Sequence, residues 1–323
     1  MKRIAVLSSG RDVSGANAAI RSIVRMGGKY GMRVFGITGG FRGLYEDHIS
    51  ALTSRDVSGK IGKASSFIGT SHAFEYLEDS KIQNCLANLN KRSIEGLIVV
   101  GGGGSFAHSR VLAEKGVPII GIPASIQDDV VGTDICLGVD TAVNNIMDCI
   151  DHIRSCDSSR NRSFLVQVEG RHSGNLAARS ALVTGAEICL IPEHNGRSLE
   201  EIYQKVQKSL DTGKTQCITI VSSGWKPGMK ALANYIEDKD KENDLIIRQT
   251  ILGYIQRGGS PSGFDRLLGT RMGAAAVEAL NAGNKNHFIG LQNSKLEVIP
   301  IEETVGKYRP VEPALFEMIK STF

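Results

Sequence analysis

The chain has 323 residues, with 38 Lys and Arg against 34 Asp and Glu, and a formal net charge of +4. Its 41% hydrophobic and 22% charged residues are typical of globular proteins and exclude a disordered or collagen-like chain. This mild charge does not favour nucleic-acid binding, and no stretch approaches the ~18 apolar residues of a membrane helix. Six scattered cysteines without a CxxC pair indicate reduced thiols in a cytoplasmic protein.

Short apolar runs alternate with helical patterns. In chain order they predict a strand at 4–7, a helix at 16–26, strands at 34–37 and 96–100, a helix at 105–115, a strand at 117–122, a helix at 141–153, a strand at 163–168, a helix at 174–184, a strand at 187–191, a helix at 199–210 and a strand at 217–222. The strands lack polar alternation, which indicates parallel sheets covered on both faces. The predicted class is α/β, with two similar doubly wound, mainly parallel-sheet domains.

Ligands of such sheets bind at the carboxyl ends of the strands. Five segments follow predicted strands in this way. They are loop one (residues 8–15), loop two (101–105), loop three (123–134), loop four (169–174) and loop five (222–224).

Glycines dominate the first two loops. Loop one places Gly10 and Gly15 before a predicted helix, a junction whose N–H groups can bind phosphate, although many such turns bind nothing. Loop two has four consecutive glycines, more than a tight turn needs, which favours a ligand lying against bare backbone.

Charged residues mark the other loops. Loop three carries Asp128, Asp129 and Asp134, which suit either a metal or base site or ordinary turn chemistry. Arg171 in loop four and Arg257 in IQRGGSPSGFDR stand among glycines, and arginine with backbone amides forms phosphate clamps.

Six motifs carry a resemblance that spans the chain: SGRDVSGANAAIR, RGLYED, IVVGGGGS, PASIQDDVVGTD, EGRHSGN and ILGYIQRGGSPSGFDR. With them the sequence resembles the bacterial ATP-dependent 6-phosphofructokinases. The resemblance implies transfer of the ATP γ-phosphoryl to fructose 6-phosphate by a homotetramer with an effector site between subunits. It also implies a nucleotide-side domain of 1–138 plus about 256–306, and a sugar-phosphate-side domain of 139–255 plus about 307–323.

Three departures fall on the chemistry that the resemblance implies. Arg11 stands where the family has the second glycine of loop one, and Gly103 stands for the aspartate of the magnesium site. Gln127 stands for the aspartate that takes the proton from the sugar hydroxyl, and losing a positioned base typically costs about 10²–10⁴-fold in rate.

Further positions also differ. His72 replaces an arginine that touches nucleotide phosphates, Tyr254 replaces a histidine at the sugar phosphate, and Ser223 replaces a glutamate that holds the sugar. Gly104 and Ala124 match the ATP-dependent type rather than the pyrophosphate-dependent branch, which has aspartate and lysine there.

The resemblance assigns the remaining roles position by position. Nucleotide binding falls to Gly10, Arg11, His72, Gly101, Gly102, Gly104 and Ser105. Sugar-phosphate binding falls to Arg162, Glu169, Gly170, Arg171, Ser223, Arg248, Tyr254 and Arg257, with Arg162 and Arg248 reaching from a neighbouring subunit. The catalytic positions are Ser125, Gln127, Asp129 and Arg171, and Asp129 is also the metal position. An effector site for ADP or phosphoenolpyruvate falls to Arg21, Arg25, Arg154, Gly185, Glu187 and Lys214. Ser54 stands where the family has another arginine of this site, and the adjacent Arg55 would compensate for it.

The losses gather on the nucleotide, magnesium and base side, whereas the sugar-phosphate and effector positions are largely kept. We therefore expect a catalytically impaired, cytoplasmic family member that binds fructose 6-phosphate or an effector. It would act as a regulatory or structural subunit, in a homotetramer or in a hetero-oligomer with an active phosphofructokinase. One alternative is an active ATP-dependent enzyme using Mg²⁺, with Asp128 as base on a rearranged backbone. The other is a kinase of another sugar phosphate. An impaired chain would need no cofactor.

Overall fold

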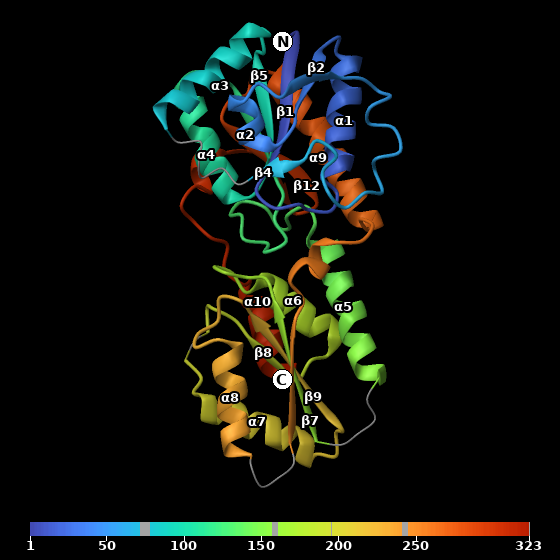
Figure 1. Cartoon of the computed structure of the whole chain (residues 1–323), viewed down its shortest axis with the longest axis vertical. Coiled ribbons are helices and arrows are strands. Elements are labelled where there is room, and N and C mark those ends of the chain that lie inside the picture. The colour runs from blue at the N-terminus through green and yellow to red at the C-terminus, as the bar shows by residue number, and fades with distance from the viewer. Residues whose placement is uncertain (72–77, 157–160, 195, 241–244, 323) are drawn as a thin grey trace. The chain divides into compact units, whose positions relative to one another are not determined.

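The computed structural model describes residues 1–71, 78–156, 161–194, 196–240 and 245–322. The chain forms two compact units (Figure 1): unit 1 comprises Met1–Thr141 and Arg257–Arg309, and unit 2 comprises Ala142–Gln256 and Pro310–Phe323. The divisions fall after residues 141, 256 and 309, where the sequence predicts 138, 255 and 306.

Unit 1 is built on an eight-stranded sheet whose main path runs β12-β11-β6-β5-β1-β2-β3, with β4 also paired to β1. The strands are β1 (Arg3–Ser9), β2 (Arg33–Ile37), β3 (Ile49–Leu52), β4 (Thr70–Ser71), β5 (Gly96–Gly101), β6 (Ile119–Pro123), β11 (His287–Gln292) and β12 (Lys295–Pro300). All pairs are parallel except the edge pairs β2–β3 and β11–β12. Every residue of β5 is buried, which explains its unbroken apolar sequence.

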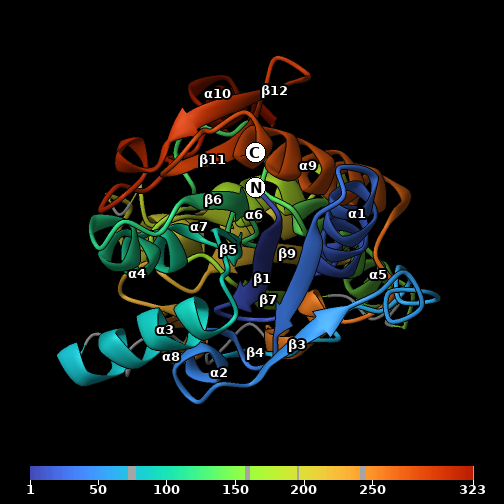
Figure 2. The same cartoon turned by 90° about the horizontal axis from the view of Figure 1, so that it is seen from above.

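Helices cover both faces of this sheet. They are α1 (Ala16–Lys29), α2 (Gly40–Tyr45), α3 (Asp79–Lys91), α4 (Gly103–Glu114) and α9 (Gly263–Asn281), with a short 3₁₀ turn, η3 (Ile301–Glu303). Figure 2 shows α1 and α9 together on one side and α3 and α4 on the other. A Cβ on Gly273 of α9 would lie 2.4 Å from the Ala19 carbonyl oxygen of α1, so glycine permits this close helix contact.

Unit 2 has a four-stranded, fully parallel sheet in the order β10-β7-β9-β8. Its strands are β7 (Arg162–Val168), β8 (Ile188–Leu190), β9 (Gln216–Ser222) and β10 (Ile246–Ile251). Its helices are α5 (Val139–Cys156, which starts in unit 1), α6 (Asn175–Thr184), α7 (Leu199–Asp211), α8 (Met229–Lys239), the 3₁₀ helix η2 (Gly253–Arg257) and α10 (Pro313–Thr322). Buried Trp225, Leu165 and Ile236 belong to one apolar core of this unit.

The predicted fold class is confirmed, with mainly parallel sheets covered by helices. The structure adds elements that the sequence pattern did not indicate, among them the antiparallel edge strands β3 and β12, the strands β10 and β11, and the helices α3, α8 and α9. Helix α4 begins at Gly103 rather than residue 105, because two loop-two glycines form its first turn. Within the described part of the chain, no helix is long and apolar enough to cross a membrane.

Candidate functional site

Three predicted loops of unit 1 lie at the carboxyl ends of neighbouring strands in its sheet. Loops one, two and three follow β1, β5 and β6, which are consecutive neighbours in the sheet. The Ala124 N–H of loop three donates to the Gly101 carbonyl of loop two at 3.0 Å. The structure therefore brings together the nucleotide-side positions of these loops; His72 lies outside the described residues.

Loop one is fixed by hydrogen bonds to the segment that leads to β4. The Gly10 N–H donates to Ser71 O at 3.0 Å, Gly10 O accepts from Thr70 Oγ1 at 2.9 Å, and φ of Gly10 is 93°. Asp12 Oδ1 accepts from the Ser66 N–H at 3.1 Å. Arg11 lines a cavity of about 10 Å³ beside these residues, room for one water rather than a phosphate.

Loop two combines one crowded glycine with two uncrowded ones. A Cβ on Gly101 would lie 2.6 Å from Ser105 Oγ and 2.9 Å from Ser9 O, so packing demands glycine there. At Gly103 the nearest atom would be Thr304 Oγ1 at 3.9 Å, and at Gly104 nothing lies within 4 Å. Space alone would therefore admit an aspartate at position 103. The N–H groups of the first turn of α4 give this loop the local chemistry of an anion site.

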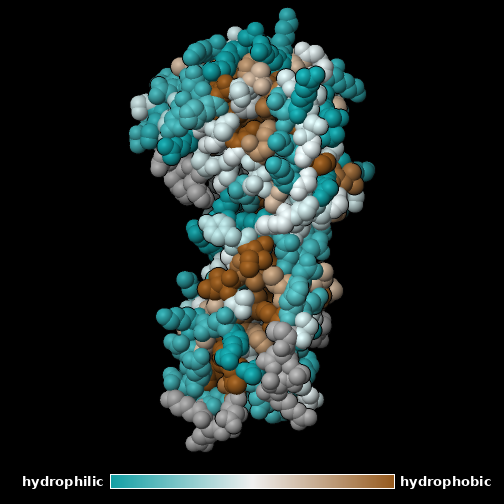
Figure 3. Space-filling view, turned by 45° about the vertical axis from the view of Figure 1, so that its right-hand side comes forward, coloured by the Kyte–Doolittle hydropathy of each residue, from teal (hydrophilic) through white to brown (hydrophobic). Residues whose placement is uncertain are grey.

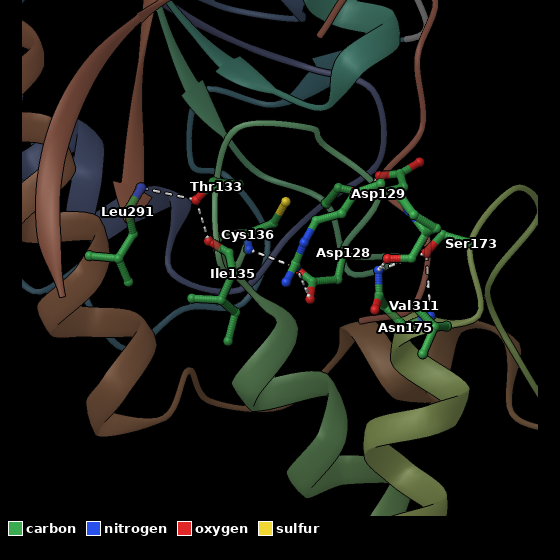
Figure 4. A network of polar contacts seen from close by, with 12 residues as sticks. Asp128, Asp129, Thr133, Ile135, Cys136, Ser173, Asn175, Leu291 and Val311 are labelled. Carbon is green, nitrogen blue, oxygen red and sulfur yellow. Dashed lines mark hydrogen bonds and ion pairs between the residues drawn. The ribbon is translucent and has the colours of Figure 1, made fainter. Parts of the chain in front are cut away.

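Loop three holds its two adjacent carboxylates differently. Asp129 Oδ1 accepts a hydrogen bond from Ser125 Oγ at 2.7 Å, and Asp129 is partly exposed. Asp128 is fully buried, accepts the Cys136 N–H at 2.8 Å and pairs with Arg309 Nη1 at 2.9 Å (Figure 4). Asp128 is therefore committed to the interior of unit 1 and is not presented to a substrate hydroxyl, as the rearranged-base alternative would need.

Loop three meets only the minimum for magnesium. Among the described residues, no group of three or more His, Cys, Asp or Glu could hold a metal ion. Magnesium is commonly held by one or two carboxylates together with substrate phosphates. Asp129 beside Ser125 fits that ion as a companion of nucleotide phosphates rather than as a resident of a protein cage.

In unit 2, loops four and five pack tightly against each other. A Cβ on Gly224 would lie 2.2 Å from Arg171 O, and Ser222 Oγ donates to Gly170 O at 2.6 Å. The Ser223 N–H donates to Val168 O at 2.9 Å. Arg171 and Ser223 are thus exposed on a rigid double turn, as a binding surface requires. Glu169 and Gly170 belong to the same turn, and the Glu169 N–H donates to Gln256 Oε1 at 3.0 Å.

The other predicted clamp arginines lie elsewhere. Arg162 is the first residue of β7, whereas loop four follows its last residue. At about 3.3 Å per residue, these two ends are about 20 Å apart. Arg248 on β10 is in register with Phe164 of β7, so it lies near the end of β7 that carries Arg162. Unit 2 alone therefore does not unite Arg162 and Arg248 with Arg171.

Two remaining sugar-side positions lie on or beside η2. Tyr254 is 83% exposed. Arg257 belongs to unit 1, where its carbonyl accepts a hydrogen bond from Ser14 Oγ at 3.4 Å. Apolar side chains are also exposed on unit 2, among them Ile251 and Ile255, and Figure 3 shows apolar surface gathered on one part of it.

A separate hollow of about 550 Å³ opens in unit 2 around Arg154, Glu187 and Lys214. Lys214 Nζ pairs with Glu187 Oε1 at 3.0 Å, and Arg154 Nη2 donates to Gly185 O at 2.9 Å. Four predicted effector positions therefore come together. The other three, Arg21, Arg25 and Arg55, belong to unit 1. Ser155, Thr215 and Gln216 also line the hollow and were missed, although the latter two directly follow Lys214.

Both units are α/β units, and their glycine runs, carboxylate pair and Arg171 follow the carboxyl ends of parallel strands, the place where proteins of this class bind their ligands. The phosphofructokinase family model matches residues 3–280. The chain is 40% identical over 320 residues to an ATP-dependent 6-phosphofructokinase of Persephonella marina, covering 98% of both chains. It is also 40% identical over 326 residues to an ATP-dependent 6-phosphofructokinase of Tolumonas auensis, and this match covers 100% of both chains. The chain therefore belongs to the phosphofructokinase family.

Solved structures agree with this assignment. Pichia pastoris phosphofructokinase superposes with a TM-score of 0.87 at 28% identity; the match covers 99% of this chain and 36% of the yeast chain. A pyrophosphate-dependent phosphofructokinase of Marinobacter aquaeolei superposes with a TM-score of 0.83 at 18% identity, which shows the shared fold alone.

Proposed function

We propose that this chain catalyses ATP-dependent phosphorylation of fructose 6-phosphate, the activity for which its relatives are named, but at a rate far below theirs. Full-length relatives at 40% identity support the reaction and weigh against a complete loss of activity. One observation carries the low rate: loop three has Gln127 in the base position, and the neighbouring Asp128 is buried in an ion pair.

Each residue of the loops has a stated part in this proposal. The Gln127 amide can hydrogen-bond a sugar hydroxyl and orient it, but it cannot accept the hydroxyl proton at neutral pH. Asp129, held by Ser125, would be the carboxylate ligand of magnesium. When bound, that ion neutralises charge on the transferring phosphoryl group. Arg171 would add a second positive charge from loop four.

A second candidate is a binding subunit without turnover, which the burial of Asp128 favours because no loop-three aspartate then replaces the base. Such a chain would bind fructose 6-phosphate together with another family member. The separation of Arg162 from loop four along β7 supports a clamp completed by a second chain. Exposed Ile251 and Ile255 support burial of this part of unit 2 in an assembly.

The hollow around Arg154 and Lys214 is proposed as part of an effector site for ADP or phosphoenolpyruvate. Its volume of about 550 Å³ lies within the usual range for small-molecule pockets. Arg154 and Lys214 give it two cations against the single carboxylate of Glu187, which leaves a net positive charge for an anionic ligand.

A single comparison tests the proposal. The purified chain is assayed for ADP release with fructose 6-phosphate and Mg–ATP, and its melting temperature is measured with each ligand separately. We expect slow but fructose 6-phosphate-dependent turnover. A rise in melting temperature with fructose 6-phosphate, without any turnover, would support the binding subunit instead. Turnover only with a different sugar phosphate would identify that compound as the substrate. Turnover as fast as that of the relatives would refute the low rate.

A further inference from the structure

Arg309, the last residue of unit 1, contacts loop three twice. Its Nη1 pairs with Asp128 Oδ2 at 2.9 Å, and its backbone N–H donates to the Asp129 carbonyl at 2.9 Å. The second oxygen of Asp128, Oδ1, accepts the Cys136 N–H at 2.8 Å (Figure 4). Side chain and backbone of one residue thus hold two consecutive residues of the loop.

The contact with Arg309 offsets two unfavourable features of Asp128. The side chain is fully buried, and a buried carboxylate is strongly unfavourable without a charged partner. Its φ of 53° lies in the left-handed region, which non-glycine residues adopt only when surrounding contacts enforce it. Arg309, whose side chain is only 17% exposed, supplies both the charge and a fixed anchor.

We propose that Arg309 is a positioning residue for loop three. By holding Asp128, which lies between Gln127 and Asp129 in the chain, it fixes the backbone that carries the proposed substrate-orienting amide and the proposed magnesium ligand. Arg309 itself touches no ligand in this scheme. The inference rests on the proposed function for the ligand, but the anchoring of the loop can be measured without one.

The test compares four full-length variants. Arg309→Met strands the buried carboxylate, Arg309→Lys keeps the charge, and Asp128→Asn/Arg309→Met removes both charges. Arg92→Met is the matched control, because Arg92 forms a partly buried pair with Asp47 in the same unit, away from loop three. For each variant we would measure the melting temperature, amide hydrogen exchange at residues 126–130, and the magnesium dependence of ATP binding.

Anchoring and stability should separate in the double variant. We expect its melting temperature to recover most of the loss seen in Arg309→Met, because no unpaired buried charge remains. Hydrogen exchange at 126–130 should stay at least about tenfold faster than in the unmodified chain, and magnesium-dependent ATP affinity about tenfold weaker, a coupling of about 1.4 kcal/mol. Compared with Arg309→Met, the Arg309→Lys variant should keep part of the slow hydrogen exchange and part of the ATP affinity. Arg92→Met should lower only the melting temperature.

Two results would overturn the inference. In one, exchange and affinity in the double variant recover together with the melting temperature. In the other, Arg92→Met disturbs loop three equally. If the unmodified chain binds no Mg–ATP, the proposed function fails, and the exchange data still decide whether Arg309 anchors the loop.

Discussion

Loops two and three of unit 1 and loops four and five of unit 2 follow buried parallel strands, but they are held in different ways. In unit 2, a Cβ on Gly224 would collide with the Arg171 carbonyl, so backbone crowding fixes the turn. In unit 1, Gly103 and Gly104 have open space, and loop three depends on the ion pair of Asp128. Packing thus requires glycine in the unit 2 turn. At position 103, by contrast, packing would admit other residues, so the residue type there affects what the loop binds rather than how it folds.

The largest expected effect comes from rebuilding the unit 1 loops. In the triple variant Arg11→Gly/Gly103→Asp/Gln127→Asp we expect kcat to rise by about 10²–10⁴-fold, because a positioned base is regained. Gly103→Asn in place of Gly103→Asp is the matched control, since an amide of the same shape fits the same space but brings no carboxylate to the proposed metal position. Coupled ADP-release assays measure both. Equal rates in the two triple variants would remove position 103 from the proposed metal site.

The unit 2 turn can be tested through Arg171. At fructose 6-phosphate a hundredfold above Kd, binding should stabilise the unmodified chain by about 2.7 kcal/mol. Arg171→Met should lose most of this stabilisation, because a charge-assisted contact to phosphate is removed. Arg179→Met, in α6 of the same unit, should keep it. Urea unfolding with and without the sugar phosphate measures the difference, and equal losses would show that Arg171 has no special part.

Glycine substitutions sharpen the contrast in packing. Gly224→Ala should lower the free energy of unfolding by about 1–3 kcal/mol, because its Cβ overlaps the Arg171 carbonyl. Gly104→Ala should raise it by about 0.5–1 kcal/mol, since alanine favours a helix and no atom crowds it. Both values come from urea unfolding. Similar costs at the two positions would contradict the difference drawn between the loops.

Alkaline pH tests the burial of Cys189, which lies in β8, an edge strand of the unit 2 sheet. Burial raises the pKa of the Cys189 thiol from 9.0 to about 12. The unfolded thiol therefore releases its proton first, so stability is full below pH 9 and falls as the pH rises towards 12. Cys189→Ala should flatten this fall by about 1.4 kcal/mol per pH unit. Partly exposed Cys149→Ala should flatten it less. Urea unfolding from pH 8 to 11 gives the slopes, and equal slopes for the unmodified chain and Cys189→Ala would contradict the prediction.

Much of the fold could be predicted from local pattern. The apolar run of β5 and the glycines after it indicated a buried parallel strand with a ligand loop at its end. Strands β10 and β12 were not predicted because they lie at sheet edges: β12 is largely exposed and interrupted by charge, and β10 contains exposed Arg248 and Gln249. Edge strands need no continuous apolar sequence, so the pattern that identified β5 is absent from them.

The site was predictable only as far as its motifs reach. Loop positions could be assigned by their resemblance to known motifs, and the structure brings the unit 1 loops together. The burial of Asp128 could not be predicted, because it depends on Arg309, which lies 181 positions away in the sequence and carries no motif of its own. Nor could the sequence alone show that Arg162 lies a full strand length from loop four.

The length of β7 has a consequence for how the protein would respond to its own abundance. A lone chain holds the two parts of the proposed phosphate clamp at opposite ends of one strand, about 20 Å apart. If a second chain completes the clamp, association and sugar-phosphate binding are linked by mass action. Dilution would then weaken binding without any change in sequence, and the sugar phosphate would in turn promote assembly.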